Sequence, residues 1–170
     1  MNRGNDVEGP MEKEYLYRVS AAATAARNGV ASAEGVASPI AFSTPPEFQG
    51  EAGQWTPEYL FLASVAGCFV STFSGIAHFS KFAFLSLTVD AEGALDREEH
   101  GWRFIRITLH PRLKIPQGKD RERAVRLLEK AEKACLIARS INSKVIAEPE
   151  LVVEGEAQER EKAEELVPIR

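Results

Sequence analysis

The chain has 170 residues, a formal net charge of −4 and 44% hydrophobic residues, values typical of an ordinary globular domain. A mildly acidic chain lacks the excess of basic residues that binds a polyanion, so nucleic acid is not an expected partner. Two cysteines are too few for a disulfide-stapled secreted scaffold. The N-terminus lacks the apolar run of a signal peptide, which favours a cytoplasmic location with both thiols reduced.

In the N-terminal third, residues 1–12 are polar and expected to be loose. Alternating side chains predict a strand over 14–26, and a second strand is expected near 35–42. Between them, Asn28-Gly29 is the strongest hairpin signal in the chain, because both residues tolerate a positive φ angle. Two adjacent prolines and two glycines in 43–55 exclude a regular element and predict a long loop.

A long helix is expected from Thr56-Pro57-Glu58 to about Phe79. Threonine can cap a helix, proline suits its first position, and an acidic residue favours its positive end. From Tyr59 to Ser80 there is no charged Asp, Glu, Lys or Arg, a stretch long enough to cross a bilayer. Its many serines and glycines favour instead a helix buried inside protein, so no membrane partner is expected.

The C-terminal half combines a hairpin with an amphipathic helix. Residues 85–92 and 105–110 alternate in polarity on either side of a charged turn, which predicts a half-exposed β-hairpin. Residues 119–134 have a helical apolar stripe that ends at Cys135, so this thiol should point inward.

A short turn or helix, 136–141, and a last strand, 145–153, complete the predicted elements, with a break or edge at Pro149. The charged residues 155–170 form a tail to which we assign no chemistry. This order indicates an α+β fold with segregated elements, and one domain over 13–154.

Cys68 and Cys135 are the candidate nucleophiles, and the residues alone leave two roles open. Free cysteine is among the most buried residue types, so two inert core thiols are the alternative to a reactive pair. Two cysteines cannot complete a zinc site, and the three histidines show no ligand spacing. No metal is therefore expected.

Residues 56–69, Thr-Pro-Glu-Tyr-Leu-Phe-Leu-Ala-Ser-Val-Ala-Gly-Cys-Phe, resemble the Asn-Pro-Glu-Glu-Leu…Ala-Ala-Cys-Phe signature of the OsmC/Ohr family of thiol-dependent hydroperoxide reductases. Glu58 precedes Cys68 by ten residues, as in that signature. The second signature of the family is a cysteine at the end of an amphipathic helix, followed by a turn that contains serine or asparagine. Cys135 matches this signature. Residues 45–50 resemble a loop in one OsmC-like subgroup, and the element order matches over about 13–154.

The resemblance implies antiparallel sheets packed around a long buried central helix in an intertwined homodimer. It also implies a peroxidase of oxidative-stress defence, in which Cys68 becomes a sulfenic acid and then forms a disulfide with Cys135. A dithiol reductant would restore the pair, and no organic cofactor is needed because the sulfurs carry the redox chemistry.

Cys68 lies in mid-helix, where burial would raise the pKa of a thiol and the helix dipole is too distant to lower it, so a nearby cation is expected. Ala25-Ala26-Arg27-Asn28-Gly29 resembles the Gly-Gly-Arg-Asp-Gly turn of the Ohr branch, which implies that Arg27 is this cation and that Glu58 anchors it. The chain departs from the family at Leu136, where many members have proline.

Four aromatic side chains are candidates for an apolar mouth that prefers alkyl hydroperoxides: Phe42, Phe48, Trp55 and Phe69. Packing in the core is their alternative role. The alternative function for the whole chain is a non-catalytic OsmC-like protein that binds a small apolar ligand and keeps its thiols for packing.

Overall fold

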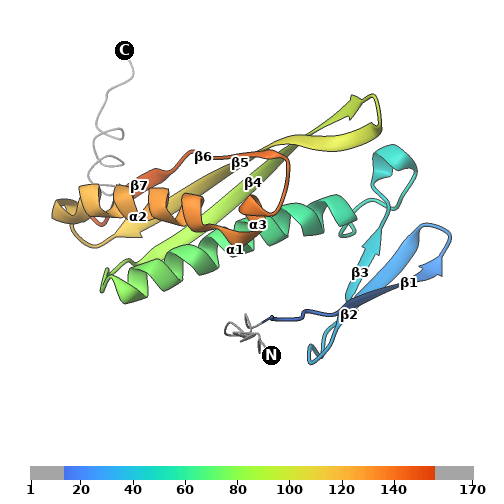
Figure 1. Cartoon of the computed structure of the whole chain (residues 1–170), viewed down its shortest axis with the longest axis horizontal. Coiled ribbons are helices and arrows are strands. Elements are labelled where there is room, and N and C mark those ends of the chain that lie inside the picture. The colour runs from blue at the N-terminus through green and yellow to red at the C-terminus, as the bar shows by residue number, and fades with distance from the viewer. Residues whose placement is uncertain (1–13, 156–170) are drawn as a thin grey trace, which may run out of the picture. The chain divides into compact units, whose positions relative to one another are not determined.

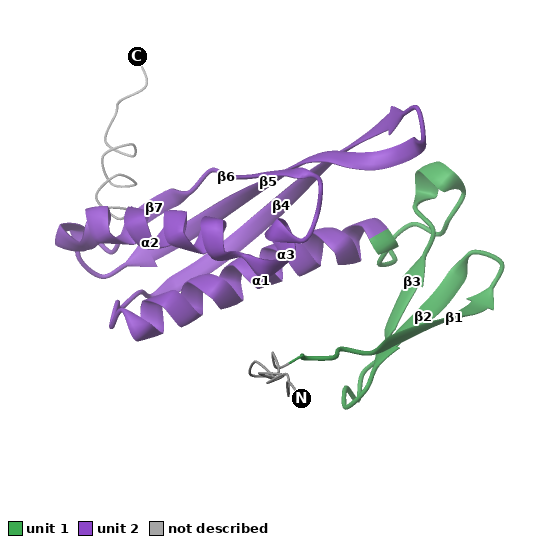
Figure 2. Ribbon diagram, in the orientation of Figure 1, with its two compact units in different colours: residues 1–57 green, residues 58–170 purple. Residues whose placement is uncertain are grey.

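The computed structural model describes residues 14–155, so the expected loose N-terminus, 1–12, and all but the first residue of the expected tail lie outside the described residues. The chain divides into two compact units, one up to Pro57 and one from Glu58 (Figure 2). The single domain expected over 13–154 is therefore described as two units.

The first unit contains a three-stranded antiparallel sheet in the order β1-β2-β3. The strands are β1 (Val19–Ala25), β2 (Asn28–Ala33) and β3 (Ile40–Ser43). The strand predicted over 14–26 is thus shorter than expected, and β3 covers only the end of the strand predicted near 35–42. The loop predicted over 43–55 contains one short 3-10 helix, η1 (Pro46–Phe48).

The expected hairpin joins β1 and β2, but its turn lies at Ala26 and Arg27, and Asn28-Gly29 begins β2 instead. Gly29 pairs with Phe42 across β2 and β3, and a Cβ atom at Gly29 would lie 2.5 Å from the Phe42 ring. Glycine is required here because an aromatic ring covers the strand, and not because the turn needs a positive φ angle.

The second unit packs its helices on one face of a four-stranded sheet (Figure 1). Its helices are α1 (Pro57–Phe79), η2 (Gly118–Asp120), α2 (Arg121–Ala134) and α3 (Leu136–Arg139). Its strands are β4 (Ser86–Glu98), β5 (Gly101–Ile115), β6 (Lys144–Ala147) and β7 (Glu150–Val153). The long helix, the hairpin and the amphipathic helix predicted from the sequence are all confirmed.

β4 and β5 form the expected antiparallel hairpin, whereas β6 and β7 pair with β5 in parallel. The expectation of purely antiparallel sheets is therefore wrong for the last two strands. The chain leaves β5, passes through α2 and α3, and returns on the far side of β5, and such a helical crossover brings the next strand back in parallel. The break expected at Pro149 is confirmed, because it separates β6 from β7.

The core of the second unit lies between this sheet and the helices. Every second residue of β5 from Ile107 to Ile115 is buried, which is the period expected of a strand with one covered face. One stripe of α1 and one of α2 cover these side chains. The α1 stripe consists of Val65, Phe69, Phe73 and Ala77, and the α2 stripe of Ala124, Leu127, Leu128 and Ala131.

α1 is also long and apolar enough to cross a membrane, and only 22% of its most apolar window is buried inside the chain. The core helix of a soluble protein meets the same criterion of length and composition. The stripe of α1 that packs on the sheet supports the interpretation as a core helix, and several residues outside this stripe are exposed.

Candidate functional site

The structure brings Cys68, in the middle of α1, together with Cys135, the residue between α2 and α3. Both thiols are free, and the Cys135 thiol donates a hydrogen bond to the Cys68 sulfur. Cys135 is buried, as its place on the apolar stripe of α2 predicts, whereas Cys68 is half-buried. Two sulfurs that are distant in the sequence therefore meet in one unit, with Cys68 the more accessible of the two.

The Cys68 sulfur is surrounded by hydrogen-bond donors. The backbone N–H of Ile137 donates to Cys68 Sγ at 3.4 Å, and Thr72 Oγ1, one helical turn along α1, lies 3.9 Å from it. Burial raises the pKa of Cys68, but hydrogen bonds from Ile137, Cys135, Thr72 and the backbone of Leu136 outweigh it. The pKa of Cys68 is therefore lowered below its ordinary value of 9.0.

Within the second unit, hydrogen bonds lower the pKa of Cys68, and the nearby cation expected from the sequence stays a prediction. These hydrogen-bond donors were not expected from the sequence. Thr72 could have been found, because residues four apart face the same side of a helix. The N–H groups of Leu136 and Ile137 carry no signal in the sequence, since every residue except proline has one.

The pKa of Cys135 is shifted in the opposite direction. Burial raises its pKa above 9.0, and the neighbouring charge of an ionised Cys68 raises it further. Cys135 therefore keeps its proton while Cys68 loses one, so the pair holds one thiolate and one thiol over a range of pH. This asymmetry distinguishes the pair from two equivalent thiols that only fill space.

Arg27, expected to be the activating cation, lies in the turn between β1 and β2 in the first unit. Its guanidinium donates to the backbone oxygen of Phe48 at 2.7 Å and to Gln49 Oε1 at 2.9 Å. The loop around η1 therefore fixes its orientation. Arg27 also lines a shallow cavity of about 280 Å³ together with Phe42, Thr44 and the alanines of β1.

Glu58 lies in the first turn of α1, where a carboxylate is favoured by the helix dipole. Its Oε2 atom is inaccessible to solvent and has no hydrogen-bond partner among the described residues. Buried carboxylate oxygens are normally paired, so this atom is one that a cationic donor would stabilise.

The four expected substrate-binding aromatics divide into two groups. Phe42 and Trp55 form an isolated parallel β-bridge in the first unit, and Phe48 is the last residue of η1. Trp55 is 51% exposed and Phe48 38% exposed, so both rings are accessible. Phe69 lies in the core of the second unit with no exposed surface, which favours its alternative role in packing.

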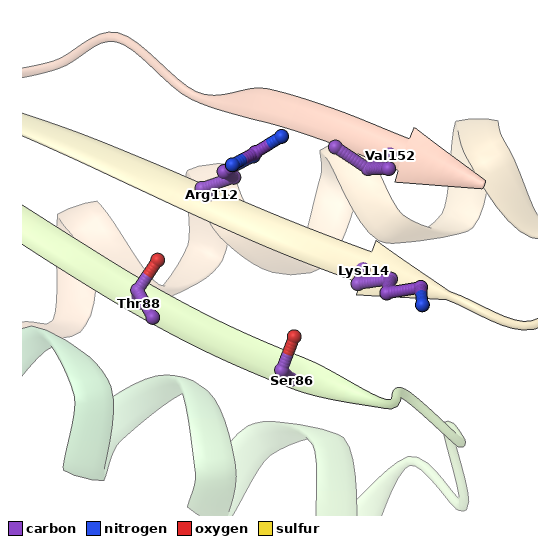
Figure 3. A pocket seen from close by; sticks show the side chains of 5 residues that line it. All are labelled: Ser86, Thr88, Arg112, Lys114 and Val152. Carbon is purple, nitrogen blue, oxygen red and sulfur yellow. The ribbon is translucent and has the colours of Figure 1, made fainter. Parts of the chain in front are cut away.

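A second cavity, of about 290 Å³, lies on the outer face of the second unit's sheet, away from the helices (Figure 3). Its lining includes Arg112 and Lys114, but each cation already pairs with a carboxylate. Arg112 Nε lies 3.2 Å from Glu150 Oε2, and Lys114 Nζ lies 3.5 Å from Glu154 Oε1. Because its charges are neutralised and no reactive group faces it, we assign this cavity no chemistry. No group of three metal-ligating His, Cys, Asp or Glu side chains occurs within residues 14–155.

The chain is similar to known proteins of one family. Residues 50–150 match the model of the family described as OsmC-like protein. The organic hydroperoxide resistance protein of Xanthomonas axonopodis pv. citri is 30% identical over 125 residues, which cover 72% of this chain and 85% of that protein.

Solved structures agree with this match. An OsmC-like protein of unknown function from Vibrio cholerae superposes with a TM-score of 0.71 at 19% identity, over 81% of this chain and all of that one. An organic hydroperoxide resistance protein from Legionella pneumophila superposes with a TM-score of 0.67 at 25% identity, over 84% of this chain and all of that one.

Proposed function

Because the chain belongs to the OsmC-like family, we propose that it is a thiol-dependent peroxidase that reduces organic hydroperoxides in oxidative-stress defence. The observation that carries the proposal is the contact between Cys68 and Cys135, in which the more accessible sulfur has the lowered pKa. A peroxidatic cysteine must be ionised and reachable, and a resolving cysteine must lie within bonding reach of it.

In the first step the Cys68 thiolate attacks one oxygen of the hydroperoxide. A sulfur–oxygen bond forms, the oxygen–oxygen bond breaks, and the departing alkoxide takes a proton and leaves as an alcohol. Cys68 is oxidised by two electrons to a sulfenic acid. In the second step Cys135 loses its proton and attacks this sulfur, so that a disulfide forms and the hydroxyl group leaves as water.

A dithiol reductant then returns both cysteines to thiols by two successive exchanges, and is itself oxidised to a disulfide. The sulfurs carry all the electrons, so the reaction needs no organic cofactor. Capture by Cys135 protects Cys68 from irreversible oxidation to the sulfinic acid.

We propose that Arg27 stabilises the oxygen of the hydroperoxide that leaves when the oxygen–oxygen bond breaks. A guanidinium stays charged when desolvated and can stabilise negative charge as it develops on that oxygen. The defined orientation of the Arg27 guanidinium supports this role, and the unpartnered Oε2 of Glu58 supports its role as the anchor of a cation.

The hydroperoxide that suits this site is an organic one. Phe42 and Arg27 line one cavity, so an alkyl group and a polar head could be held side by side. Phe48 and Trp55 offer further accessible apolar surface in the same unit. Burial of an alkyl chain against such rings stabilises organic hydroperoxides relative to hydrogen peroxide, which has no apolar surface to bury.

The active form is proposed to be a cytoplasmic homodimer. All seven residues of β1 are exposed, and only 22% of the most apolar window of α1 is buried. Nearby Tyr17 is 90% exposed and Val19 72% exposed. A single copy with this much bare apolar surface would be costly in water, and a second copy of the same chain provides the matching surfaces.

The proposal is tested by adding stoichiometric cumene hydroperoxide to the fully reduced protein and counting free thiols. We expect both thiols to be lost as an intramolecular disulfide, with one molecule of cumyl alcohol formed for each chain. If both thiols stay unreacted in the native protein, the chain is not a peroxidase, and the alternative of a ligand-binding protein with structural thiols would replace it.

Two variants separate the roles of the cysteines. Cys68→Ser should abolish turnover with every reductant, because the attacking sulfur is absent. Cys135→Ser should complete a single turnover and leave a sulfenic acid on Cys68, which dimedone labelling and mass spectrometry detect. A Cys68→Ser protein with wild-type turnover would contradict the assignment.

A further inference from the structure

The groups that surround the Cys68 sulfur include two that belong to the backbone. The N–H of Ile137 points at Cys68 Sγ at 3.4 Å, and the N–H of Leu136 contributes the smallest of the influences that lower the pKa of the same thiol. Both residues follow Cys135 directly in the chain. The segment that carries the second cysteine therefore also carries donors to the first.

We propose that the N–H groups of Leu136 and Ile137 are positioning donors that hold the Cys68 sulfur as a thiolate facing Cys135. This proposal rests on the proposed peroxidase function and deepens it. Both groups act through Cys68, since the Cys68 sulfur is the atom to which they donate.

The local backbone explains why these donors are available. Cys135 has extended backbone angles, φ −62° and ψ 112°, and separates the end of α2 from the start of α3. Leu136 and Ile137 are the first two residues of α3, and the first N–H groups of a helix have no acceptor within it. A hydrogen bond from such a group to a sulfur outside the helix therefore replaces one to water.

Within the second unit, the groups with the largest effect on the pKa of Cys68 are not charged side chains. Cys135 is the titratable group that faces it, and none of the leading influences on the pKa of Cys68 comes from a charged side chain. On α2, Glu132 accepts a hydrogen bond from the backbone N–H of Ala147, and Arg139 on α3 is exposed. Neutral donors thus carry the stabilisation of the thiolate in this unit.

This arrangement couples two steps of the reaction. If residues 135–137 move away from α1, Cys68 loses the donors that keep it ionised and loses its disulfide partner at the same time. A conformation that activates the first cysteine is therefore also the one that allows the second to react.

Leu136→Pro tests the proposal at the level of a single N–H group. Extended backbone at Cys135 suits the residue before a proline, and proline suits the first position of a helix, so the local fold should tolerate the change. The matched control is Leu136→Ala, which keeps the N–H and truncates a side chain that is 66% exposed.

The measurement is the rate of alkylation of Cys68 by iodoacetamide as a function of pH, with each cysteine followed by mass spectrometry of its peptide. We expect the midpoint for Cys68 in Leu136→Pro to move up by about half a unit to one unit, with Leu136→Ala unchanged. At a pH below the midpoint this corresponds to a fall in rate of about three- to tenfold.

A second variant tests Ile137 without a new side chain. Ligation at Cys135 allows the peptide bond that precedes Ile137 to be replaced by an ester, which removes the N–H and keeps the shape. We expect an upward shift of about one unit. Circular dichroism of each variant controls for folding.

Unchanged Cys68 midpoints in both variants would overturn the inference. A wild-type protein that has a low Cys68 midpoint but no peroxidase turnover would instead contradict the proposed function, so the two failures are distinguishable.

Discussion

At the sulfur of Cys68, burial and hydrogen bonding act on the pKa in opposite directions, and hydrogen bonding prevails. A thiolate needs donors more than a thiol does, because a hydrogen bond to an ion is worth about twice one between neutral groups. The neighbour, Cys135, shows the opposite balance, since burial and the charge of Cys68 both raise its pKa. The pair therefore combines a more acidic, half-buried thiol with a less acidic, buried one.

The pH dependence of alkylation should reveal this asymmetry. Because only the thiolate reacts, a lowered pKa means that Cys68 reaches half its maximal rate below pH 9.0, and Cys135 only above it. In Cys135→Ala one donor is lost, so the Cys68 midpoint should move up. Cys135→Ser keeps a hydroxyl donor and should leave it near the wild-type value.

The same iodoacetamide profile, resolved by peptide, measures both cysteines in one experiment. A Cys68 midpoint that is identical in the Cys135→Ala and wild-type proteins would show that the two sulfurs do not interact.

Arg27 permits a second prediction at the residue scale. We expect Arg27→Met to lower kcat/KM for cumene hydroperoxide by about a hundredfold, the usual cost of removing one group that stabilises developing charge. Arg27→Lys keeps the charge but cannot hold both Phe48 and Gln49 in the same way, so its activity should be intermediate.

Steady-state kinetics with a coupled reductant provides the measurement, and a circular dichroism spectrum controls for folding. Wild-type kcat/KM in Arg27→Met would remove Arg27 from the mechanism.

At the scale of elements, the position of Cys135 depends on how α2 is attached to the sheet. Glu132, three residues before Cys135, accepts a hydrogen bond from the backbone N–H of Ala147 in β6 at 3.0 Å. At the start of α2, Arg123 donates to the backbone oxygen of Ser80 and stacks over Phe82. Both ends of the helix are thus held by polar contacts in addition to its apolar stripe.

Glu132→Ala should lower the free energy of unfolding by about 1–3 kcal/mol, because the Ala147 N–H would lose its acceptor in a partly buried place. Glu132→Gln keeps an acceptor oxygen and should recover most of this loss. Glu129→Ala is the matched control, since Glu129 is an exposed residue of the same helix. Urea unfolding measures all three, and equal stabilities of Glu132→Ala and Glu129→Ala would contradict the role of Glu132.

At the scale of the whole molecule, the face of α1 that carries its exposed residues is the one proposed to contact a second copy of the chain. Gly67 lies on this face and is exposed, and a Cβ atom there would meet no other heavy atom of the chain within 4 Å. A larger residue at this position therefore fits a single copy, and replacing glycine inside a helix favours the helix itself.

Gly67→Arg should convert a dimer to monomers without unfolding the chain, because it adds bulk and charge to the contact between copies. Thr88→Arg adds the same side chain on the exposed outer face of the sheet and should remain dimeric. Light scattering coupled to gel filtration measures the mass of each. A wild-type protein with the mass of one chain would contradict the proposed dimer.

Much of the fold could be predicted from the periodicity of side chains. The apolar stripe of α2 predicted that Cys135 points inward, and alternation in 85–92 and 105–110 predicted the β4–β5 hairpin, because both signals depend only on local geometry. Local reasoning was wrong at Asn28-Gly29, where the glycine makes room for Phe42 from another strand. It was also wrong for β6 and β7, whose direction depends on the path through α2 and α3.

By itself the sequence pointed to the residues proposed to carry the chemistry, because the chain has only two cysteines and Arg27 and Glu58 lie in motifs that resemble those of the family. Only the tertiary structure decided how Cys68 is ionised. The strongest of its donors is the backbone N–H of Ile137, a group that nearly every residue possesses, and only folding decides which N–H reaches the sulfur.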